Sequence, residues 1–260
     1  MSVGLLLLAA GMAMALYACL IEPRWLEVTR HEVAAPVARP LTIAHLSDLH
    51  TQGLGPLERR VIAVLERERP DVIVLTGDYL PTGGRGQGAL EVLRRLHAPL
   101  GVWAVKGNHD GSEEVRLVRD GGVRMLVNEA VQLRDEVWLV GLDNAVAGSP
   151  DADAALAGLP EGAFAIALFH FPTALPTVSA QVQLALAGHT HGGQIRIPGL
   201  TRLWLPPGSG KFAQGWHQEN RCQMYVSRGL GTSLLPVRFR CRPELALLTL
   251  TPDGAVLPRV

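Results

Sequence analysis

The sequence predicts an α/β protein in which two packed β-sheets are flanked by helices and preceded by one membrane helix. Three observations predict this class. Residues 3–21 form an apolar segment at the N-terminus. Strand-like and helix-like patterns then alternate from residue 41 to about residue 105, and helical patterns thin out after about residue 180. Alternation followed by a β-rich half is typical of two sheets packed between helices.

The composition sets limits on domain number and on partners. A chain of 260 residues with 48% hydrophobic residues can build one sizeable core, so we expect one domain plus a short appendage. The 24 basic and 24 acidic residues balance, which argues against nucleic acid as a partner. The three cysteines, Cys19, Cys222 and Cys241, form no CxxC pair, which excludes a cysteine zinc site. We expect Cys222 and Cys241 to be buried thiols rather than a disulfide.

The N-terminal segment is long enough to cross a membrane. Every residue from 3 to 21 is apolar or glycine, and about 20 such residues span a hydrocarbon core of about 30 Å as a helix. No basic residue precedes the segment, which favours a retained anchor (residues 1–22) over a cleaved signal peptide. The alternative is a lipidated Cys19 after Leu16-Tyr17-Ala18. Basic residues after the span place the remaining chain on the cytoplasmic side of a bacterial inner membrane.

The rest of the chain divides into a linker and one domain. Three prolines indicate a linker over residues 23–40, and the domain is expected over residues 41–260. Its first strand is predicted at residues 41–46, followed by a helix that ends near Pro70. A second strand, a second helix and a third strand are expected at residues 71–76, 90–96 and 102–105. Later strands are predicted at residues 137–142, 163–169, 182–187, 223–227 and 245–250.

Five short polar clusters follow predicted strands, which is where an α/β sheet places its ligand sites. They are Asp48-Leu49-His50, Gly77-Asp78, Gly107-Asn108-His109-Asp110, His170, and Gly188-His189-Thr190-His191. Each cluster alone has an ordinary structural explanation, such as a turn or a hydrogen-bonded histidine. Five in succession are hard to explain as independent accidents. Oxygen and imidazole donors without cysteine suit Mn, Fe or Zn in an open hydrolytic site.

The local spacing supports metal binding. Asp48 and His50 are two residues apart on an extended segment, so both side chains can face one ion. Gly77 lacks a side chain and lets the Asp78 carboxylate approach closely enough to bridge two ions. Two cations about 3.5–4 Å apart need such an anionic bridge. Asn108 offers a neutral oxygen that adds no negative charge beside an anionic substrate.

The ordered clusters resemble the calcineurin-like metallophosphoesterase superfamily, over roughly residues 41–251. The string from Gly188 to Gln194 and the stretch from Ser227 to Ser233 are similar to its bacterial YkuE-like and YaeI-like phosphodiesterases. The resemblance implies a four-layer α/β/β/α sandwich with two mixed sheets and two divalent metal ions. One departure is the string His170-Phe171-Pro172-Thr173, where relatives tend to carry Asn and Asp after the histidine.

The resemblance also implies roles for single residues. His109 would be the general acid for the leaving oxygen, and Asp110 would either orient its ring or cap the following helix. By likeness, one metal would take Asp48, His50, Asp78 and His191, and the other Asp78, Asn108, His170 and His189.

The substrate is predicted from weaker signals. Trp204, in an apolar loop, would contact a lipid or acyl chain, or else cover the core. Arg228 would reach a phosphate, or else form an ion pair. We predict a membrane-anchored phosphodiester or pyrophosphate hydrolase acting on a lipid-linked substrate such as UDP-2,3-diacylglucosamine, an intermediate of lipid A synthesis. The alternatives are a phosphomonoesterase, a cyclic-nucleotide phosphodiesterase and a non-catalytic metal-stabilised membrane scaffold.

Overall fold

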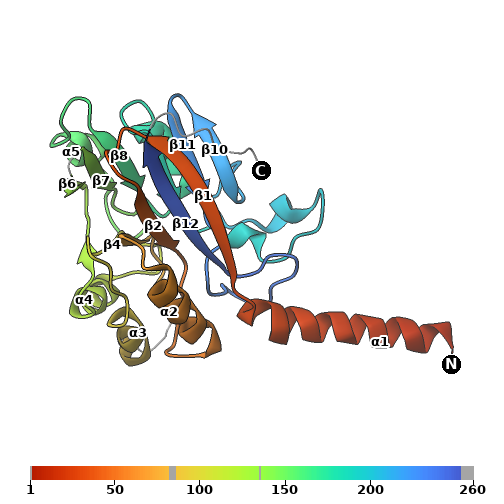
Figure 1. The fold of residues 1–260 in the computed structure, drawn as a ribbon. Helices are drawn as coiled ribbons and strands as arrows, with labels where there is room; N and C mark the ends of the chain where they lie inside the picture. The colour runs from red at the N-terminus through yellow and green to blue at the C-terminus, as the bar shows by residue number, and fades with distance from the viewer. Residues whose placement is uncertain (1, 82–85, 135, 253–260) are drawn as a thin grey trace.

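Two six-stranded sheets pack face to face and carry helices on their outer faces (Figure 1). The computed structural model describes residues 2–81, 86–134 and 136–252, so the last residues of the predicted domain, 253–260, lie outside the described part. The arrangement is an α/β/β/α sandwich with two mixed sheets. This confirms the fold class that the sequence predicts.

The first sheet holds the strands that follow the N-terminal helix. Strand β1 runs parallel to β12, β12 runs antiparallel to β2, and β2 to β5 are parallel. In spatial order the strands are β1 (Glu27–Ala35), β12 (Glu244–Pro252), β2 (Leu41–Leu46), β3 (Val72–Leu75), β4 (Val102–Ala104) and β5 (Arg124–Met125).

The second sheet has four parallel strands in its centre. Strands β7, β8, β9 and β11 are parallel, and the edge strands β6 and β10 run antiparallel to their neighbours. In spatial order the strands are β10 (Gly215–Glu219), β11 (Cys222–Val226), β9 (Leu184–Ala187), β8 (Phe164–Leu168), β7 (Val137–Gly141) and β6 (Glu129–Arg134).

Three apolar layers hold the sandwich together. The first joins the facing sides of the sheets, where Ile43 and Val74 pack in one cluster with Ile166 and Leu186. The other two layers lie under the outer helices. Parallel strands in the centre of a sheet are covered on both faces, so their sequences are mostly apolar. The first sheet is covered by α2 (Pro56–Glu68), α3 (Gly86–Leu93) and α4 (Ser112–Asp120), and the second by α5 (Ala152–Leu156) and α6 (Leu175–Val178).

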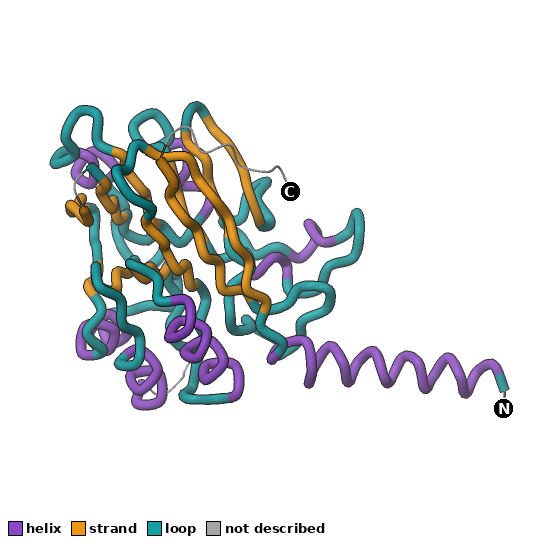
Figure 2. Tube along the Cα trace, viewed as in Figure 1, coloured by secondary structure: helices purple, strands orange, loops and turns teal. Residues whose placement is uncertain are grey.

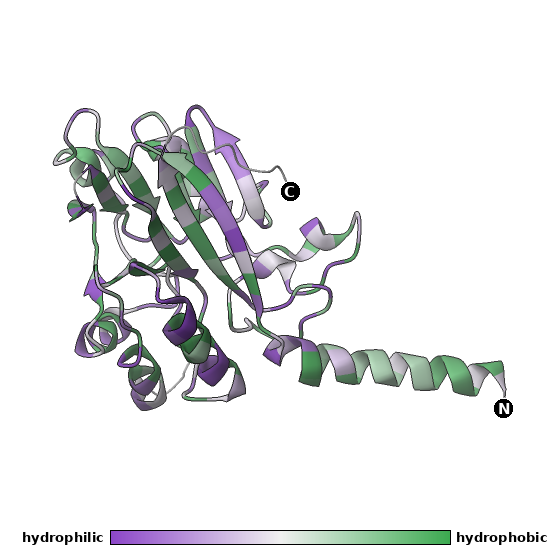
Figure 3. Ribbon diagram, in the orientation of Figure 1, coloured by the Kyte–Doolittle hydropathy of each residue, from purple (hydrophilic) through white to green (hydrophobic). Residues whose placement is uncertain are grey.

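The N-terminal helix projects away from the sandwich (Figures 1 and 2). Segments α1 (Val3–Leu16), η1 (Tyr17–Ile21) and η2 (Glu22–Arg24) together make a 22-residue helix with the length and composition of a membrane span. No residue of α1 is buried, and the helix is apolar along most of its length (Figure 3). Cys19 on this helix is an exposed free thiol.

Two details differ from or refine the sequence prediction. The expected linker, residues 23–40, contains β1, a nine-residue edge strand with every residue paired to β12. Its alternation is weak because only Val33 and Ala35 are buried, and charged residues on an exposed edge protect it from pairing with other chains.

Cys222 and Cys241 are both buried free thiols, as predicted.

Candidate active site

The five polar clusters meet where strands of both sheets end. They follow the C-termini of β2, β3, β4, β8 and β9, which are parallel within each sheet and bring their loops to a common edge. These loops appear in teal below the strands in Figure 2. The five clusters that the sequence analysis singled out therefore lie together at one end of the fold.

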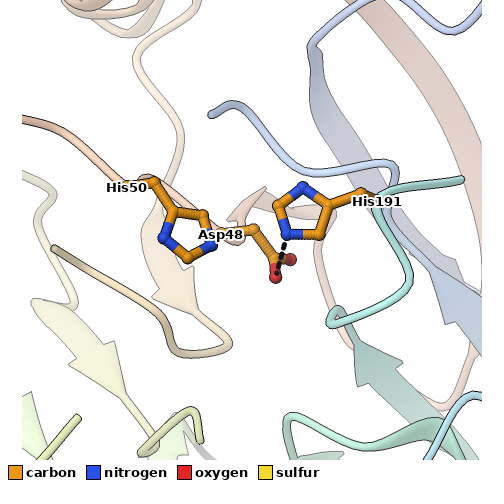
Figure 4. Close-up of side chains that lie close together, drawn as sticks. All are labelled: Asp48, His50 and His191. Atoms are coloured by element: carbon orange, nitrogen blue, oxygen red, sulfur yellow. Dashed lines mark ion pairs between the residues drawn. The ribbon is translucent and has the colours of Figure 1, made fainter. Parts of the chain in front are cut away.

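One group of candidate ligands comes from the first and last clusters. Asp48, His50 and His191 each offer one ligand atom within 4.8 Å of the others (Figure 4). The Asp48 Oδ1 atom lies 3.3 Å from the Nε2 atom of His191. The Asp48 carboxylate is held in place because it accepts hydrogen bonds from the Ser47 hydroxyl at 2.5 Å and from the His189 backbone N–H at 3.0 Å.

The Asp78 carboxylate lies between this group and a second one. Its Oδ2 atom is 3.6 Å from His50 Nε2 and 3.5 Å from His170 Nε2. Asp48, Asp78 and His170 form a second set whose ligand atoms lie within 4.8 Å of one another. A carboxylate shared in this way has the position that a bridge between two cations requires.

Asn108 and His189 complete the second group. The Asn108 Oδ1 atom lies 3.0 Å from His170 Nε2, and the Nδ1 atom of His189 lies 3.2 Å from the same nitrogen. The structure thus brings together all seven side chains that the sequence analysis named as candidate metal ligands.

Backbone carbonyls orient the rings of His50, His170 and His189. The Nδ1–H group of His50 donates to the Leu80 carbonyl at 3.2 Å, and that of His170 donates to the Thr76 carbonyl at 2.6 Å. A carbonyl only accepts, so these contacts fix the tautomers and leave Nε2 of His50 and His170, and Nδ1 of His189, for a metal. The Thr76 carbonyl orients His170 although the polar residues that relatives tend to carry after this histidine are missing.

The charges of the site favour bound cations. Burial lowers the pKa of His189 to about 4 and that of His191 to about 3, so both rings are neutral, as metal ligands must be. Burial also acts to lower the pKa of His170, but the Asp78 carboxylate outweighs it and raises this pKa to about 9. A carboxylate that stabilises positive charge this strongly attracts a divalent cation.

The residues fit two divalent metal ions. His50 Nε2, which lies 3.6 Å from Asp78 Oδ2, is a buried nitrogen with no hydrogen-bond partner among the described residues. A buried polar atom without a partner costs about 1–3 kcal/mol, and a coordinated cation would satisfy it. The donors are carboxylate, amide and imidazole groups, which suit Mn, Fe or Zn.

The loops that present the ligands have unusual backbone conformations. Gly77 and Gly107 lie so close together that a Cβ atom on Gly77 would collide with the Gly107 backbone nitrogen. A side chain at position 77 would therefore prevent the close approach of these two loops. Left-handed non-glycine residues are uncommon, and such strain gathers at functional sites. Five candidate ligands have positive φ angles: Asp48, His50, Asp78, His189 and His191.

Asp110 contacts the backbone of the loops around it. Its buried carboxylate accepts hydrogen bonds from the backbone N–H groups of Asp78, Tyr79 and Gly107 at 2.7–3.1 Å. It therefore joins the loops after β3 and β4 and positions Asp78, and Gly111 caps α4 instead. Burial and the neighbouring Asp78 raise the pKa of Asp110 to about 7.

Arg228 does not face the metal ligands. Its guanidinium donates to Glu27 at 2.9 Å and to Glu244 at 3.1 Å, and only 13% of the side chain is exposed. The ion pair links the start of β1 to the start of β12. The structure thus places Arg228 in the ion pair that the sequence analysis gave as the alternative to a phosphate contact.

Trp204 and His109 line a cavity that opens onto the ligands. The cavity measures about 600 Å³, and Asp78, Asn108 and His191 contribute to its floor. Its walls are mostly apolar, from Phe171, Ile195, Trp204, Leu205, Pro206, Pro207, Leu234 and Leu235. The Trp204 Nε1–H group donates to the Gly193 and Ile195 carbonyls, so the ring is held at the wall rather than in the core.

His109 is placed beside the proposed bridge and toward solvent. Its Nε2 atom is 4.0 Å from Asp78 Oδ2, and one third of its side chain is exposed. Its backbone N–H donates to Asp78 Oδ1 at 3.0 Å. This ring is accessible from the cavity, whereas the side chains of His50, His170 and His191 are almost fully buried.

Residues 41–193 match the family model of the calcineurin-like phosphoesterases. The chain belongs to this family of metal-dependent phosphoester hydrolases. It is 34% identical to an uncharacterized metallophosphoesterase, YkuE, from Bacillus subtilis, over 90% of this chain and 88% of that one. It is 32% identical to phosphodiesterase YaeI from Escherichia coli, over 88% and 90%. The crystal structure of TT1561 from Thermus thermophilus shares the fold, with a TM-score of 0.51, 16% identity and coverage of 73% of this chain and 90% of that one.

Proposed function

We propose that the protein is a dinuclear metal-dependent hydrolase of phosphodiester or pyrophosphate bonds. The observation that carries this proposal is the position of Asp78, whose Oδ2 atom lies within 4.0 Å of ring nitrogens of His50, His170 and His109. Family membership gives the reaction class, and this geometry supports a bridging role for Asp78. Asp48, His50 and His191 would hold one ion and Asn108, His170 and His189 the other.

The bound cations, the residues that hold the ligands and His109 would have different roles in the reaction. Bound divalent cations supply Lewis-acid activation of water and of the phosphoryl oxygens. The chain's own contribution is to hold the ligands in place through Ser47, Asp110 and the Thr76 carbonyl. His109 would donate a proton to the leaving oxygen, because its ring is accessible from the cavity and lies next to the ligand cluster.

The test is a panel of phosphoesters offered to metal-stripped protein reloaded separately with Mn, Zn, Fe, Mg and Ca. We expect diesters or pyrophosphates to be hydrolysed faster than monoesters, with Mn, Zn or Fe as the effective ions. A protein that hydrolyses no ester with any of these ions would contradict the proposal.

We further propose an amphiphilic substrate such as UDP-2,3-diacylglucosamine, which would place the enzyme in lipid A synthesis. The support is an apolar cavity wall directly above polar ligands, in a chain that carries a helix of membrane-spanning length. Each methylene buried against this wall would add about 0.8 kcal/mol to binding. Acylated substrates should therefore be preferred over unacylated ones.

The acyl preference is measured as a ratio of kcat/KM values for the acylated and unacylated compounds. Trp204→Ala should lower that ratio, because the ring forms part of the cavity wall and is not one of the candidate ligands. An enzyme without acyl preference would contradict the lipid-linked substrate and leave the general phosphodiesterase.

We propose a bacterial inner-membrane location with the catalytic domain in the cytoplasm. The support is the apolar helix Val3–Arg24 and the arginines that follow the apolar segment, Arg24, Arg30 and Arg39. A reporter fused after Val260 should be active only in a cytoplasmic assay. Activity only in the periplasm would reverse the orientation.

A further inference from the structure

Two exposed apolar loops border the mouth of the cavity on the side from which α1 projects. The first is residues 195–205, drawn in cyan in Figure 1, which extends in the same direction as α1. Its Leu203 side chain is 78% exposed. The second loop is residues 233–236, in which Leu234 is fully exposed and Leu235 is 62% exposed. A soluble protein seldom gathers large apolar side chains in one exposed region without a partner.

The two loops are held together by Gln194. Its amide nitrogen donates to the carbonyls of Ser233 and Leu235 at 3.1 and 3.3 Å, and its oxygen accepts from the Ser233 N–H at 2.6 Å. Leu234 adopts a left-handed backbone conformation with φ of 61°. A left-handed leucine is strained, and the contacts on either side hold it in this exposed position.

The same region holds the end of the N-terminal helix. The Arg238 backbone N–H donates to the Ala18 carbonyl at 2.9 Å, and the Cys241 N–H donates to the Glu22 carboxylate. The Arg242 guanidinium lies 4.6 Å over the Trp25 ring. The helix is therefore fixed to the segment that carries Leu234, so an embedded helix would bring these leucines to the membrane surface.

The charges near the loops suit an anionic surface. Residues 195–214 contain Arg196, Arg202 and Lys211 and no acidic residue. Residues 231–240 also lack acidic residues, and their Arg240 is exposed. Exposed apolar residues flanked by basic ones are typical of surfaces that insert into anionic phospholipid bilayers.

We propose that residues 195–205 and 233–236 form a bilayer-inserting surface, with the mouth of the metal-site cavity opening at the membrane–water boundary. The partner is the anionic phospholipid bilayer that holds α1. An amphiphile could then offer its phosphate to the site while its acyl chains stay in the bilayer. The inference rests on the membrane anchor of the proposed function and does not depend on the identity of the substrate.

Fluorescence quenching tests the surface directly. The full chain is reconstituted into phosphatidylcholine and phosphatidylglycerol vesicles whose acyl chains carry bromine, which quenches nearby tryptophan. Trp204→Phe should remove part of the quenchable signal. Trp216→Phe is the matched control, because Trp216 is also 39% exposed but lies on β10, where its ring packs beside His31 and Tyr225. Equal quenchable signals in wild type and Trp204→Phe would overturn the proposal.

An activity assay provides a second, independent readout. Leu203→Glu should slow hydrolysis of a vesicle-embedded phosphodiester at least tenfold and leave a water-soluble diester unaffected, because Leu203 lies outside the cavity lining. Ala154→Glu places the same charge on α5, at the far end of the fold from α1 (Figure 1). It should change neither rate. Equal rates for wild type and Leu203→Glu on the embedded substrate would overturn the proposal.

A result that disproves the bilayer-inserting surface can be distinguished from a result that disproves the proposed hydrolase function. A chain without any hydrolase activity would still report on the surface through Trp204 quenching. A chain that carbonate washing removes from the vesicles would overturn the anchor and the surface together, whatever its activity on soluble diesters.

Discussion

His109 differs from the other histidines of the site in the exposed fraction of its side chain. The rings of His50, His170 and His191 are buried among carboxylates, whereas one third of the His109 side chain is exposed. In the proposed mechanism, a ring in this position would exchange protons with a substrate while the buried rings would hold metal. The roles of these histidines are therefore separable by mutation.

We predict that His109→Ala retains both metal ions and slows turnover by about 10²–10⁴, the range expected for loss of a general acid. The loss should be smaller for nitrophenyl esters than for alkyl esters, because an acidic leaving group needs less protonation. Metal analysis and kcat for both ester types check this, with the exposed His97→Ala as control. Equal losses for both leaving groups would speak against a general acid.

Arg228 stabilises the fold through a largely buried ion pair. Burial acts to raise the pKa of Glu244, but the Arg228 guanidinium outweighs it, so this carboxylate stays charged in the folded protein. A pKa held below its unfolded value stabilises the fold at neutral pH, and this stability is lost as the pH falls through the folded-state pKa.

We predict that Arg228→Gln lowers stability by about 3 kcal/mol, because it leaves the buried Glu244 carboxylate without its partner. Arg30→Gln is the control, since it breaks an exposed pair with Glu68 and should cost less than about 1 kcal/mol. Thermal unfolding measures both, and the difference should shrink in acid. A raised KM with unchanged stability would return Arg228 to a substrate-binding role.

At the scale of elements, β1 is part of the sandwich. All nine of its residues pair with β12, and Val33 packs into the layer between the sheets while Leu26, directly before the strand, packs into the layer under the outer helices. Without β1, the β12 backbone becomes an exposed edge that can pair with other chains.

We therefore predict that a chain starting at Leu41 aggregates, although the sequence pattern suggested a domain boundary there. A chain starting at Glu22 keeps β1 and the contact to Cys241, and it should remain monomeric in the absence of detergent or with little of it. Size-exclusion chromatography distinguishes the two. A monomeric, folded chain from Leu41 would show that β1 is dispensable.

Local patterns explain which features the sequence could predict. The buried strands β3 and β8 are continuous apolar runs, β2 is mostly apolar, and the candidate ligands sit in short motifs directly after these strands. Both signals depend on neighbours in the sequence. The edge strand β1 gives a weak signal because only two of its nine residues, Val33 and Ala35, are buried.

Long-range contacts explain what the sequence could not predict. The role of Arg228 depends on Glu27, which is 201 residues away, and that of Asp110 on Asp78 and Tyr79, more than 30 residues away. The sequence alone does not show whether an arginine or aspartate contacts a substrate, another charged side chain or a backbone group. Only the folded chain decides between these partners.

At the scale of the whole molecule, the two sheets bring their ligand-bearing loops to one edge. The first sheet supplies Asp48, His50, Asp78 and Asn108, and the second supplies His170, His189 and His191. Each group of the candidate centre thus draws side chains from both sheets, with Asp78 between the groups. Metal binding should therefore also stabilise the packing of one sheet against the other.

The most direct test of this account is the metal content of Asp78→Ala compared with wild type, measured by mass spectrometry alongside phosphodiester hydrolysis. We predict about two ions per chain in wild type, as a dinuclear site requires, and loss of hydrolysis when a chelator removes them. Asp78→Ala should lose both ions and all activity, because the carboxylate stands between both groups of ligands. Two ions per chain in Asp78→Ala, or hydrolysis that survives metal removal, would contradict the bridged dinuclear centre.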